Sequence, residues 1–290
     1  MKNINIIGAC SDFGVHVDGS RLGPETLEKN INPNEINTIA NVIADIVPKD
    51  TNKNNLRKNI NEVNKFNEKL YFEALNSLNN NFMPLTIGGD HSIAIASGLA
   101  SIKKHNNLGL IWFDAHGDFN TFDTTTSGNI HGLPFAVLCN YEKRDLANFH
   151  DGNFYNPKNA VLVGARDIDK PGELENLKKA GITIFTTDDI KKLGCDYVYR
   201  KAFEIASSGT NGIHISYDID VIDPKIAPGV SIPAKDGIDL NEAYEFVDFI
   251  INNKNSVKSI DLVELNPLRD IDCKTQNIAQ KILDKLIKNL

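Results

Sequence analysis

Short runs of Ile, Val, Leu and Phe recur along the chain and predict the buried strands of a parallel sheet. Strands covered on both faces carry apolar residues in succession, without polar residues between them. Segments with helical spacing lie between these runs, and the clearest has apolar side chains at Ile60, Val63, Phe66, Leu70, Ala74 and Leu78. The predicted strands are residues 4–7, 84–87, 108–113, 160–163, 183–185, 212–215 and 259–263, and further helices are expected near 174–180, 197–206 and 242–251.

The alternation of strands and helices predicts an α/β fold. Such βαβ units place helices on both faces of a mainly parallel sheet. No Pro- or Ser-rich linker and no internal repeat interrupts the pattern, so residues 1–290 are predicted to form a single domain. The Asn- and Lys-rich stretch 49–61 is interpreted as a solvated loop that leads into a helix.

Composition narrows the class of partner. The chain has 31 Lys and Arg against 38 Asp and Glu, a formal net charge of −7, which argues against nucleic acid or an anionic membrane as the main partner. The apolar run at the N-terminus breaks at Gly8 and lacks the pattern of a signal peptide, and no run approaches the length of a membrane span. The four cysteines are scattered without CxxC spacing, as is typical of free thiols in a reducing compartment. We therefore expect a cytoplasmic protein.

Ionisable residues alternate directly after the strand 108–113. Asp114, His116 and Asp118 share one face of an extended chain, because residues two apart point to the same side. Two carboxylates and an imidazole that converge there would repel and desolvate one another without a cation. The alternative is a polar, hydrogen-bonded turn, which has no need of three alternating ionisable groups.

Two further segments place similar residues at strand ends. His91 follows a pair of glycines after the strand 84–87, and taken alone it is more typical of a structural histidine than of a metal ligand. Asp218 and Asp220 again alternate at the end of an apolar strand. Because ligands bind beyond the carboxyl ends of parallel strands, we expect the three segments to form one site. Its candidate ligands are His91, Asp114, His116, Asp118, Asp218 and Asp220.

This ligand set predicts metal-assisted hydrolysis. Four carboxylates offset the charge of two divalent cations. Oxygen and imidazole ligands without thiolate favour Mn²⁺, although Fe²⁺, Co²⁺ or Zn²⁺ could occupy the same site. Two metals about 3.5–4 Å apart can share a water and lower its pKa toward roughly 7, which yields a hydroxide nucleophile at neutral pH.

The segments GGDHS (88–92), DAHGD (114–118) and SYDIDVIDP (216–224) resemble the three metal-binding signatures of the ureohydrolases, the family of arginase, agmatinase and formimidoylglutamase. The resemblance runs from Ile4 to the C-terminal region and implies a three-layer α/β/α fold and two Mn²⁺ per chain with a bridging hydroxide. It also implies a homo-oligomer, a trimer or a hexamer. Carried over to this chain, it assigns His91, Asp114, Asp118 and Asp218 to the first metal, and His116, Asp114, Asp218 and Asp220 to the second.

The same resemblance assigns catalytic roles. Amidine and guanidine carbons are poor electrophiles, so the site must hold the planar group in place and protonate the leaving amine. Glu264, in the segment VELNP, matches the glutamate that binds the guanidinium group, and His131 matches a histidine proposed to act in proton transfer. Asp118 would accept a hydrogen bond or a proton from the nucleophile.

The resemblance also indicates L-arginine as the substrate, hydrolysed to L-ornithine and urea. The segment 124–132 is similar to the arginase loop whose serine and asparagine, here Ser127 and Asn129, recognise the α-carboxylate together with Asn120. Asp169 and Glu173 resemble the acids that face the α-amino group. Agmatine has no carboxylate, so an agmatinase has no use for this set of donors.

Three departures from the arginase pattern keep other functions open. Lys170 is an extra residue before Pro171, Ile232 replaces a threonine near the guanidinium group, and the loop 16–22 matches only loosely. The alternatives for this small-molecule site are agmatinase, formimidoylglutamase and hydrolases of other guanidino acids. A different class is a catalytically silent metal-binding protein of the same fold.

Overall fold

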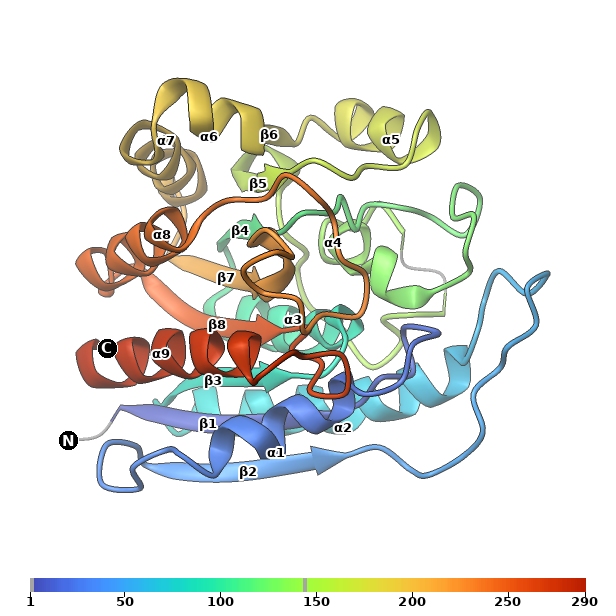
Figure 1. Cartoon of the computed structure of the whole chain (residues 1–290), viewed down its shortest axis with the longest axis horizontal. Helices are drawn as coiled ribbons and strands as arrows, with labels where there is room; N and C mark the ends of the chain where they lie inside the picture. The colour runs from blue at the N-terminus through green and yellow to red at the C-terminus, as the bar shows by residue number, and fades with distance from the viewer. Residues whose placement is uncertain (1–2, 143–144) are drawn as a thin grey trace.

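The computed structural model describes residues 3–142 and 145–290, and in these ranges it contains one parallel sheet of eight strands. The strand order is β2-β1-β3-β8-β7-β4-β5-β6, which places β3, β8, β7 and β4 in the middle (Figure 1). The strands are β1 Ile4–Cys10, β2 Thr38–Ile43, β3 Met83–Gly88, β4 Gly109–Phe113, β5 Ala160–Ala165, β6 Thr183–Thr186, β7 Ile213–Asp218 and β8 Val257–Val263.

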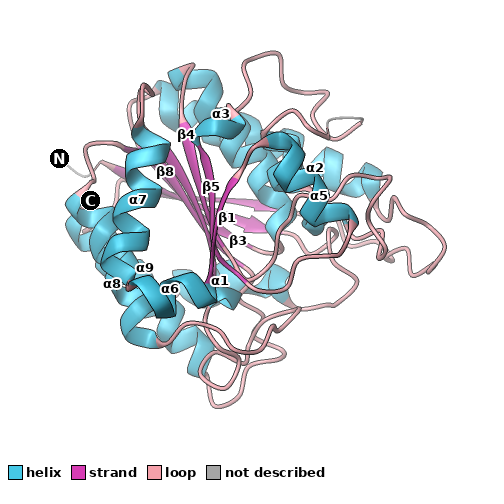
Figure 2. Ribbon diagram, turned by 90° about the horizontal axis from the view of Figure 1, so that it is seen from above, coloured by secondary structure: helices cyan, strands magenta, loops and turns pink. Residues whose placement is uncertain are grey.

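Helices cover both faces of the sheet, as Figure 2 shows, which confirms the expected three-layer α/β/α fold. Helices α1, α6, α7, α8 and α9 pack with one buried cluster, and α2 to α5 pack with the other. No helix of the described ranges has the length and apolar content to cross a membrane. The helices are α1 Gly23–Glu28, α2 Ile60–Asn79, α3 Ala94–His105, α4 Pro134–Leu138, α5 Gly172–Ala180, α6 Thr187–Leu193, α7 Cys195–Ser207, α8 Leu240–Asn252 and α9 Lys274–Asn289.

Helix α8 illustrates how local sequence produces these elements. Asp239 caps its N-terminus by accepting hydrogen bonds from the backbone of Asn241 and Glu242, and Glu242 bonds back to the Asp239 amide. This reciprocal arrangement satisfies amides that the first turn leaves without partners. The buried side chains then recur with helical spacing and face the sheet; they are Ala243, Phe246, Val247 and Ile250.

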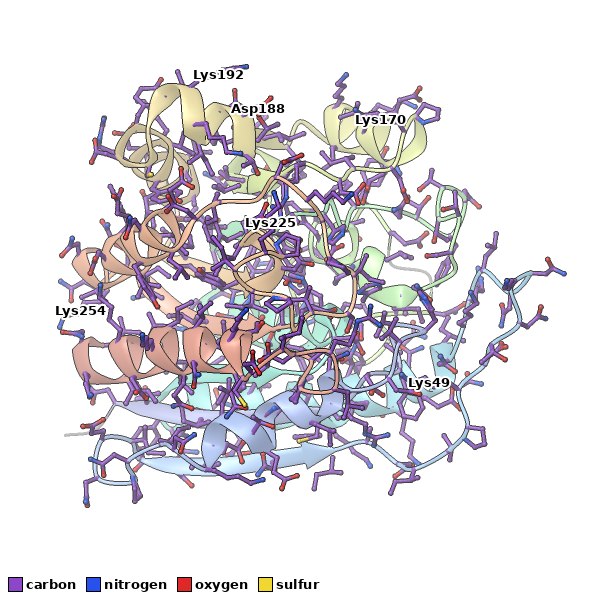
Figure 3. The ribbon with its side chains drawn as sticks, viewed as in Figure 1. Lys49, Lys170, Asp188, Lys192, Lys225 and Lys254 are labelled. Carbon is purple, nitrogen blue, oxygen red and sulfur yellow. The ribbon has the colours of Figure 1, made fainter. Side chains whose placement is uncertain are left out.

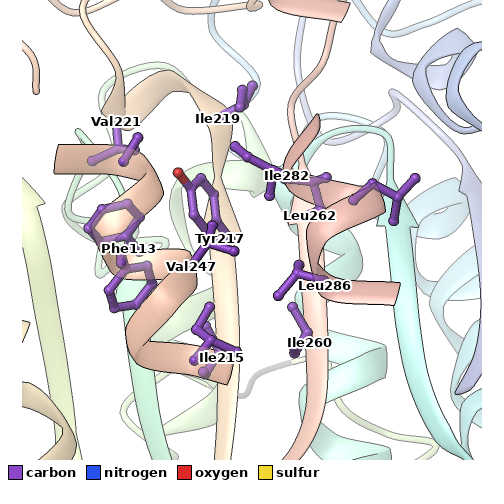
Figure 4. Close-up of a cluster of buried hydrophobic side chains, with 14 of the residues drawn as sticks. Phe113, Ile215, Tyr217, Ile219, Val221, Val247, Ile260, Leu262, Ile282 and Leu286 are labelled. Atoms are coloured by element: carbon purple, nitrogen blue, oxygen red, sulfur yellow. The ribbon is translucent and has the colours of Figure 1, made fainter. Parts of the chain in front are cut away.

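The core directly beneath the site is aromatic. Phe113, the last residue of β4, is fully buried and stacks on Phe246 of α8 with ring centroids 4.0 Å apart. It also contacts the ring of Tyr217 on the neighbouring strand at 4.8 Å (Figure 4). Since Asp114 follows Phe113 immediately, this packing fixes the end of the strand from which the predicted ligands project.

Replacing Phe113 with alanine is expected to lower the free energy of unfolding by about 3–5 kcal/mol, because the lost ring leaves a cavity that the stacked neighbours cannot fill. Urea titration monitored by circular dichroism would measure the loss. Phe72→Ala is the matched control, since Phe72 is 56% exposed and its removal should cost within about 0.5 kcal/mol. Equal losses for the two variants would contradict the role given to this core.

The seven predicted strands are all present, whereas β2 was not predicted. Every residue of β2 is exposed or half-buried, because this strand lies at the edge of the sheet. Its apolar residues Ile39, Ala40, Val42 and Ile43 are interrupted by Asn41. The interpretation of 49–61 as a solvated loop is only partly correct. Lys58 is 8% exposed, and Lys49 forms ion pairs with Asp12 (3.1 Å) and Asp18 (2.9 Å). The loop therefore packs against the molecule through its lysines.

Candidate active site

The polar residues predicted to form one site follow the four central strands. His91 comes after β3, Asp114 after β4, and Glu264 after β8, while Asp218 ends β7. Because these strands are parallel neighbours in the sheet, their carboxyl ends meet at one edge. The sheet order thus explains how residues more than 170 positions apart in the sequence, such as His91 and Glu264, come into contact.

His91 is the centre of the first cluster. Its Nδ1 lies 3.0 Å from Asp114 Oδ2, 3.2 Å from Asp118 Oδ2 and 3.1 Å from Asp218 Oδ2. The imidazole is 1% exposed, and Nδ1 forms no hydrogen bond with any described residue. A buried nitrogen that faces three carboxylates without a hydrogen bond is suited to donate its lone pair to a cation.

His116 forms the second cluster. Its Nδ1 lies 3.4 Å from Asp114 Oδ1 and 3.0 Å from Asp220 Oδ2. Asp114 therefore presents one oxygen to each histidine, as expected for a residue that bridges two metals. Asp218, the other expected bridge, lies in the His91 cluster.

Burial makes charge costly in both clusters. It raises the pKa of Asp118 to about 7 and the pKa of Asp218 well above its usual value, and nearby carboxylates add to both shifts. Burial alone would lower the pKa of His91 and of His116, but the adjacent carboxylates outweigh it and raise both well above the usual value. Such carboxylates need either protons or cations to offset their charge.

The donor set fits divalent metal ions. Two groups of residues bring one nitrogen and two carboxylate oxygens within 4.8 Å of one another; they are His91, Asp114 and Asp218, and Asp114, His116 and Asp220. Mixed imidazole and carboxylate donors without thiolate suit Mn²⁺ and related ions. Binding cations here would also remove the electrostatic cost of burying these carboxylates.

Short side-chain to backbone hydrogen bonds orient the carboxylates. Asp114 Oδ1 accepts the His116 amide at 2.7 Å, and Asp218 Oδ1 accepts the Asp220 amide at the same distance. Trp112 Nε1 donates to Asp114 Oδ2 at 2.9 Å, and the Trp112 ring stacks on His91 with centroids 4.0 Å apart. The turn also requires Gly117, because a Cβ there would lie 2.6 Å from the Glu173 carboxyl carbon.

Arg166 supports the turn that carries Asp220. Its guanidinium donates to the backbone carbonyls of Asp220 (2.8 Å), Val221 (2.9 Å) and Ala234 (2.9 Å). Burial lowers the pKa of Arg166, while the charge of Asp220 raises it. Because Arg166 ties segments on both sides of the turn together, it fixes the position of Asp220 without donating to its carboxylate.

The buried Glu264 pairs with the half-buried imidazole of His131. Glu264 Oε1 accepts the His91 amide at 2.9 Å and lies 3.1 Å from His131 Nδ1, whereas Oε2 is buried without a hydrogen-bond partner among the described residues. Burial would lower the pKa of His131, but Glu264 outweighs it and raises this pKa. Glu264 also has a positive φ of 68°, a strained backbone conformation for a residue with a side chain. Strain of this kind is common at functional sites.

A cavity of about 230 Å³ opens beside the two clusters. His116, Asp118 and His131 line it at the cluster side, and Ile232 is also part of its wall. Five other predicted residues line the same cavity, namely Asn120, Ser127, Asn129, Asp169 and Glu173. His91, Asp114, Asp218, Asp220 and Glu264 are buried next to this space and do not line it.

The extra residue of this chain, Lys170, does not displace the acidic residues from the cavity wall. Lys170 is exposed beside α5 (Figure 3), while Asp169 and Glu173 both remain in the cavity wall. Asn120 Nδ2 donates to Asp169 Oδ2 at 3.1 Å. Glu173 accepts the amides of Phe119 (2.9 Å) and Asp169 (2.8 Å), and burial raises its pKa to about 8. Glu173 thus ties two segments of the wall together.

Several polar residues near the cavity were not predicted as site residues. Thr125, Thr126 and Asp167 line its wall, and His16 and Lys58 add charge-bearing groups. His16 lines the cavity with its Nδ1 2.9 Å from Asn129 Nδ2, and Lys58 donates from Nζ to the carbonyl of Ser127. Burial lowers the pKa of His16, and the charges of His131 and Lys58 add to this shift. Neither His16 nor Lys58 follows a strand, so only the tertiary structure reveals their position.

Known proteins resemble this chain over almost its whole length. Residues 2–288 match the model of the arginase family. The chain is 39% identical over 280 residues to an arginase of Staphylococcus aureus strain MRSA252, which covers 93% of this chain and 91% of that protein. It is 33% identical over 292 residues to an arginase of Bacillus subtilis strain 168, covering 99% and 98%. The crystal structure of Entamoeba histolytica arginase in complex with L-ornithine has a TM-score of 0.89 and 28% identity, covering 98% of each chain.

Proposed function

The chain belongs to the arginase family, and we propose that it hydrolyses L-arginine to L-ornithine and urea with two bound Mn²⁺ ions. The observation that carries this proposal is a single cavity beside both histidine and aspartate clusters. Amide, hydroxyl and carboxylate groups line the rest of its wall. The relatives are named arginases, and the Entamoeba histolytica enzyme was crystallised with L-ornithine.

His91 and His116 would hold one ion each, with Asp114 shared between them. Two cations held there would supply Lewis acidity and would lower the pKa of a water molecule toward roughly 7, the chemistry that hydrolysis of a guanidinium group at neutral pH needs. Asp118 adjoins both the His91 cluster and the cavity. Its carboxylate is therefore placed to accept a hydrogen bond from the attacking water.

Other residues of the cavity wall fit the amino-acid end of the substrate. Ser127 and Asn129 offer hydroxyl and amide donors to an α-carboxylate, and the buried cation of Lys58 lies behind this loop. Asp169 offers a carboxylate to the α-ammonium group. A wall that offers both donors for a carboxylate and an acid for an ammonium group favours a zwitterionic amino acid over agmatine, which carries no carboxylate.

The test is product formation by Mn²⁺-loaded protein offered arginine, agmatine, formimidoylglutamate and short guanidino acids separately. We expect urea and ornithine from arginine. The other substrates should have a kcat/KM at least about tenfold lower, since a difference of about 1.4 kcal/mol in binding gives this factor. Preference for another substrate would overturn the choice of arginine, and no product with two metals bound would favour the silent metal-binding protein. A cytoplasmic homo-oligomer, a trimer or a hexamer, and a single domain spanning 1–290 stay predictions.

His131→Ala is expected to lower kcat by about 10²-fold or more, because general acid catalysis typically contributes this much. Glu264 raises the pKa of His131 and so favours the protonated imidazole, whose contribution should be present below this pKa and lost as pH rises through it. The alkaline decline of kcat with pH should disappear in the variant. Metal content, measured in parallel, should remain at the level of the unmodified protein; equal loss of metal and turnover would contradict the role in proton transfer.

A further inference from the structure

A second buried acid lies beneath the His91 cluster. Asp261, on β8, is fully buried, and its Oδ2 accepts hydrogen bonds from Ser97 of α3 at 2.6 Å and from Ser216 of β7 at 3.4 Å. His214 Nε2 lies 3.1 Å from the same oxygen. A buried carboxylate is costly and persists only where surrounding groups stabilise it. This acid is not one of the candidate metal ligands, so its burial calls for another explanation.

Ser216 connects this acid to His91. Its Oγ lies 2.8 Å from His91 Nε2, the ring nitrogen that faces away from the three carboxylates of the cluster. For Nδ1 to offer a lone pair to a cation, the ring proton must be on Nε2. Nε2 then donates to Ser216 Oγ, and the Ser216 hydroxyl proton is free to point toward Asp261.

We propose that Asp261 is a positioning residue for the metal site at His91. Through the hydroxyl of Ser216, Asp261 holds the His91 imidazole in the tautomer that binds metal. The proposal rests on the two-metal site proposed above and goes beyond it by naming a residue outside the ligand set. A fixed carboxylate at the end of such a chain makes the imidazole more basic and limits its rotation. Both effects strengthen its bond to a divalent cation.

The second histidine lacks an equivalent support. His116 Nε2 has no hydrogen-bond partner among the described residues, and the oxygen that pairs with it, Asp167 Oδ2, is 4.0 Å away on a side chain that is 66% exposed. The two metal positions therefore differ in what lies behind the histidine. Loss of Asp261 should weaken one ion selectively, whereas a general loss of structure would weaken both.

The experiment measures Mn²⁺ binding to the full chain by equilibrium dialysis. Asp261→Asn should bind one of its two ions about 10–100-fold more weakly, the usual effect of removing such a partner, with the other ion within about threefold of the unmodified protein. To identify the ion, the substitution is repeated in the His116→Asn and His91→Asn backgrounds. It should weaken the single remaining ion in the first background and leave it unchanged in the second.

Thr86→Val is the matched control. Thr86 lies opposite Asp261 on β3, is 1% exposed, and its hydroxyl has no partner among the described residues. A change at this position alters buried polarity one strand away without touching the chain of hydrogen bonds. Its affinity for both ions should stay within about threefold of the unmodified protein, because the partners that orient both histidines are retained.

A double-substitution cycle tests the connection itself. If Asp261 acts through Ser216, then Asp261→Asn should add little to the loss caused by Ser216→Ala, whereas independent roles would give additive losses and overturn the proposal. Equal weakening of both ions, or of neither, would also overturn it. If Asp261→Asn fails to fold, Ser97→Ala, which removes the shortest hydrogen bond to this acid, should give a smaller weakening confined to the same ion. Because metal affinity is measured, the result stands apart from whether arginine is the substrate.

Discussion

Replacing Asp114 with alanine is expected to abolish binding of two Mn²⁺ ions and to lower kcat for arginine by about 10³-fold or more, the scale lost when groups that stabilise the transition state are removed. Asp114 is fully buried and faces His91 with one oxygen and His116 with the other. No other residue belongs to both three-residue groups found among the described residues. Metal content after dialysis and steady-state urea release would measure the two effects.

Thermal unfolding distinguishes loss of metal from loss of structure in this variant. Saturating Mn²⁺ should raise Tm of the unmodified protein, since a ligand at 100 times its Kd adds about 2.7 kcal/mol per site. The Asp114→Ala protein should show a much smaller rise. Without metal, its Tm should be lower than that of the unmodified protein, because Trp112 Nε1 and the His116 amide lose the carboxylate that accepts their hydrogen bonds. The loss of metal is therefore judged from the size of the rise that Mn²⁺ produces in each protein.

Asp167→Ala is the control for Asp114→Ala, since Asp167 is an acid near His116 whose side chain is 66% exposed. It should retain two Mn²⁺ ions and their effect on Tm. Two bound ions in Asp114→Ala would show that this residue does not bridge the clusters, and an apo protein that fails to fold would show that it is needed for structure first.

The central part of the site could be predicted because two periodicities agree there. Residues alternate along an extended chain, so Asp114, His116 and Asp118 were expected on one face, and the structure places all three beside His91 or one another. Each predicted cluster also follows a buried strand, whose apolar run is uninterrupted in β4 but contains Thr86 in β3 and His214 and Ser216 in β7. In a parallel sheet such strands end at a common edge, which predicted that the clusters lie along one edge, and the sheet order makes their strands neighbours.

The rest depends on contacts that no local pattern records. The edge strand β2 has no buried position, and Asn41 interrupts its apolar residues, so its sequence alone did not mark it as a buried strand. Lys58 was placed in a solvated loop because its neighbours are polar, yet it is 8% exposed and donates to the loop of Ser127. Asp261 occupies the middle of an apolar strand, where its partners come from α3 and β7. Its environment follows from the sheet order and not from its own sequence segment.

Glu264→Gln is the second substitution with a large expected effect. It should lower kcat/KM for arginine by about 10²–10³-fold, because one partner of a buried charge pair loses its charge. Glu264 Oε1 already accepts the His91 amide, whereas Oε2 is buried without a partner among the described residues. That free oxygen is suited to a guanidinium N–H. In the variant an amide NH₂ would take the place of one oxygen and present a donor to a cationic group.

The same substitution should change the pH dependence of turnover. Glu264 is the group that raises the pKa of His131 most strongly, so its neutralisation should lower that pKa. If His131 acts in its protonated form, the alkaline decline of kcat should then begin at a lower pH. Two Mn²⁺ ions should remain bound, because Glu264 is in neither of the two metal-ligand groups found among the described residues.

Glu142→Gln provides the matched control for Glu264→Gln. Glu142 is also 2% exposed and accepts a backbone amide, that of Phe122 at 3.0 Å, but it is not among the described residues that line the cavity. Its neutralisation should leave kcat/KM and the pH profile within about twofold, because no group near the reacting atoms changes charge. If Glu264→Gln changed kcat/KM no more than this control, Glu264 would only support the backbone of His91. If it lowered kcat/KM without moving the pH profile, Glu264 would bind the guanidinium group without tuning His131.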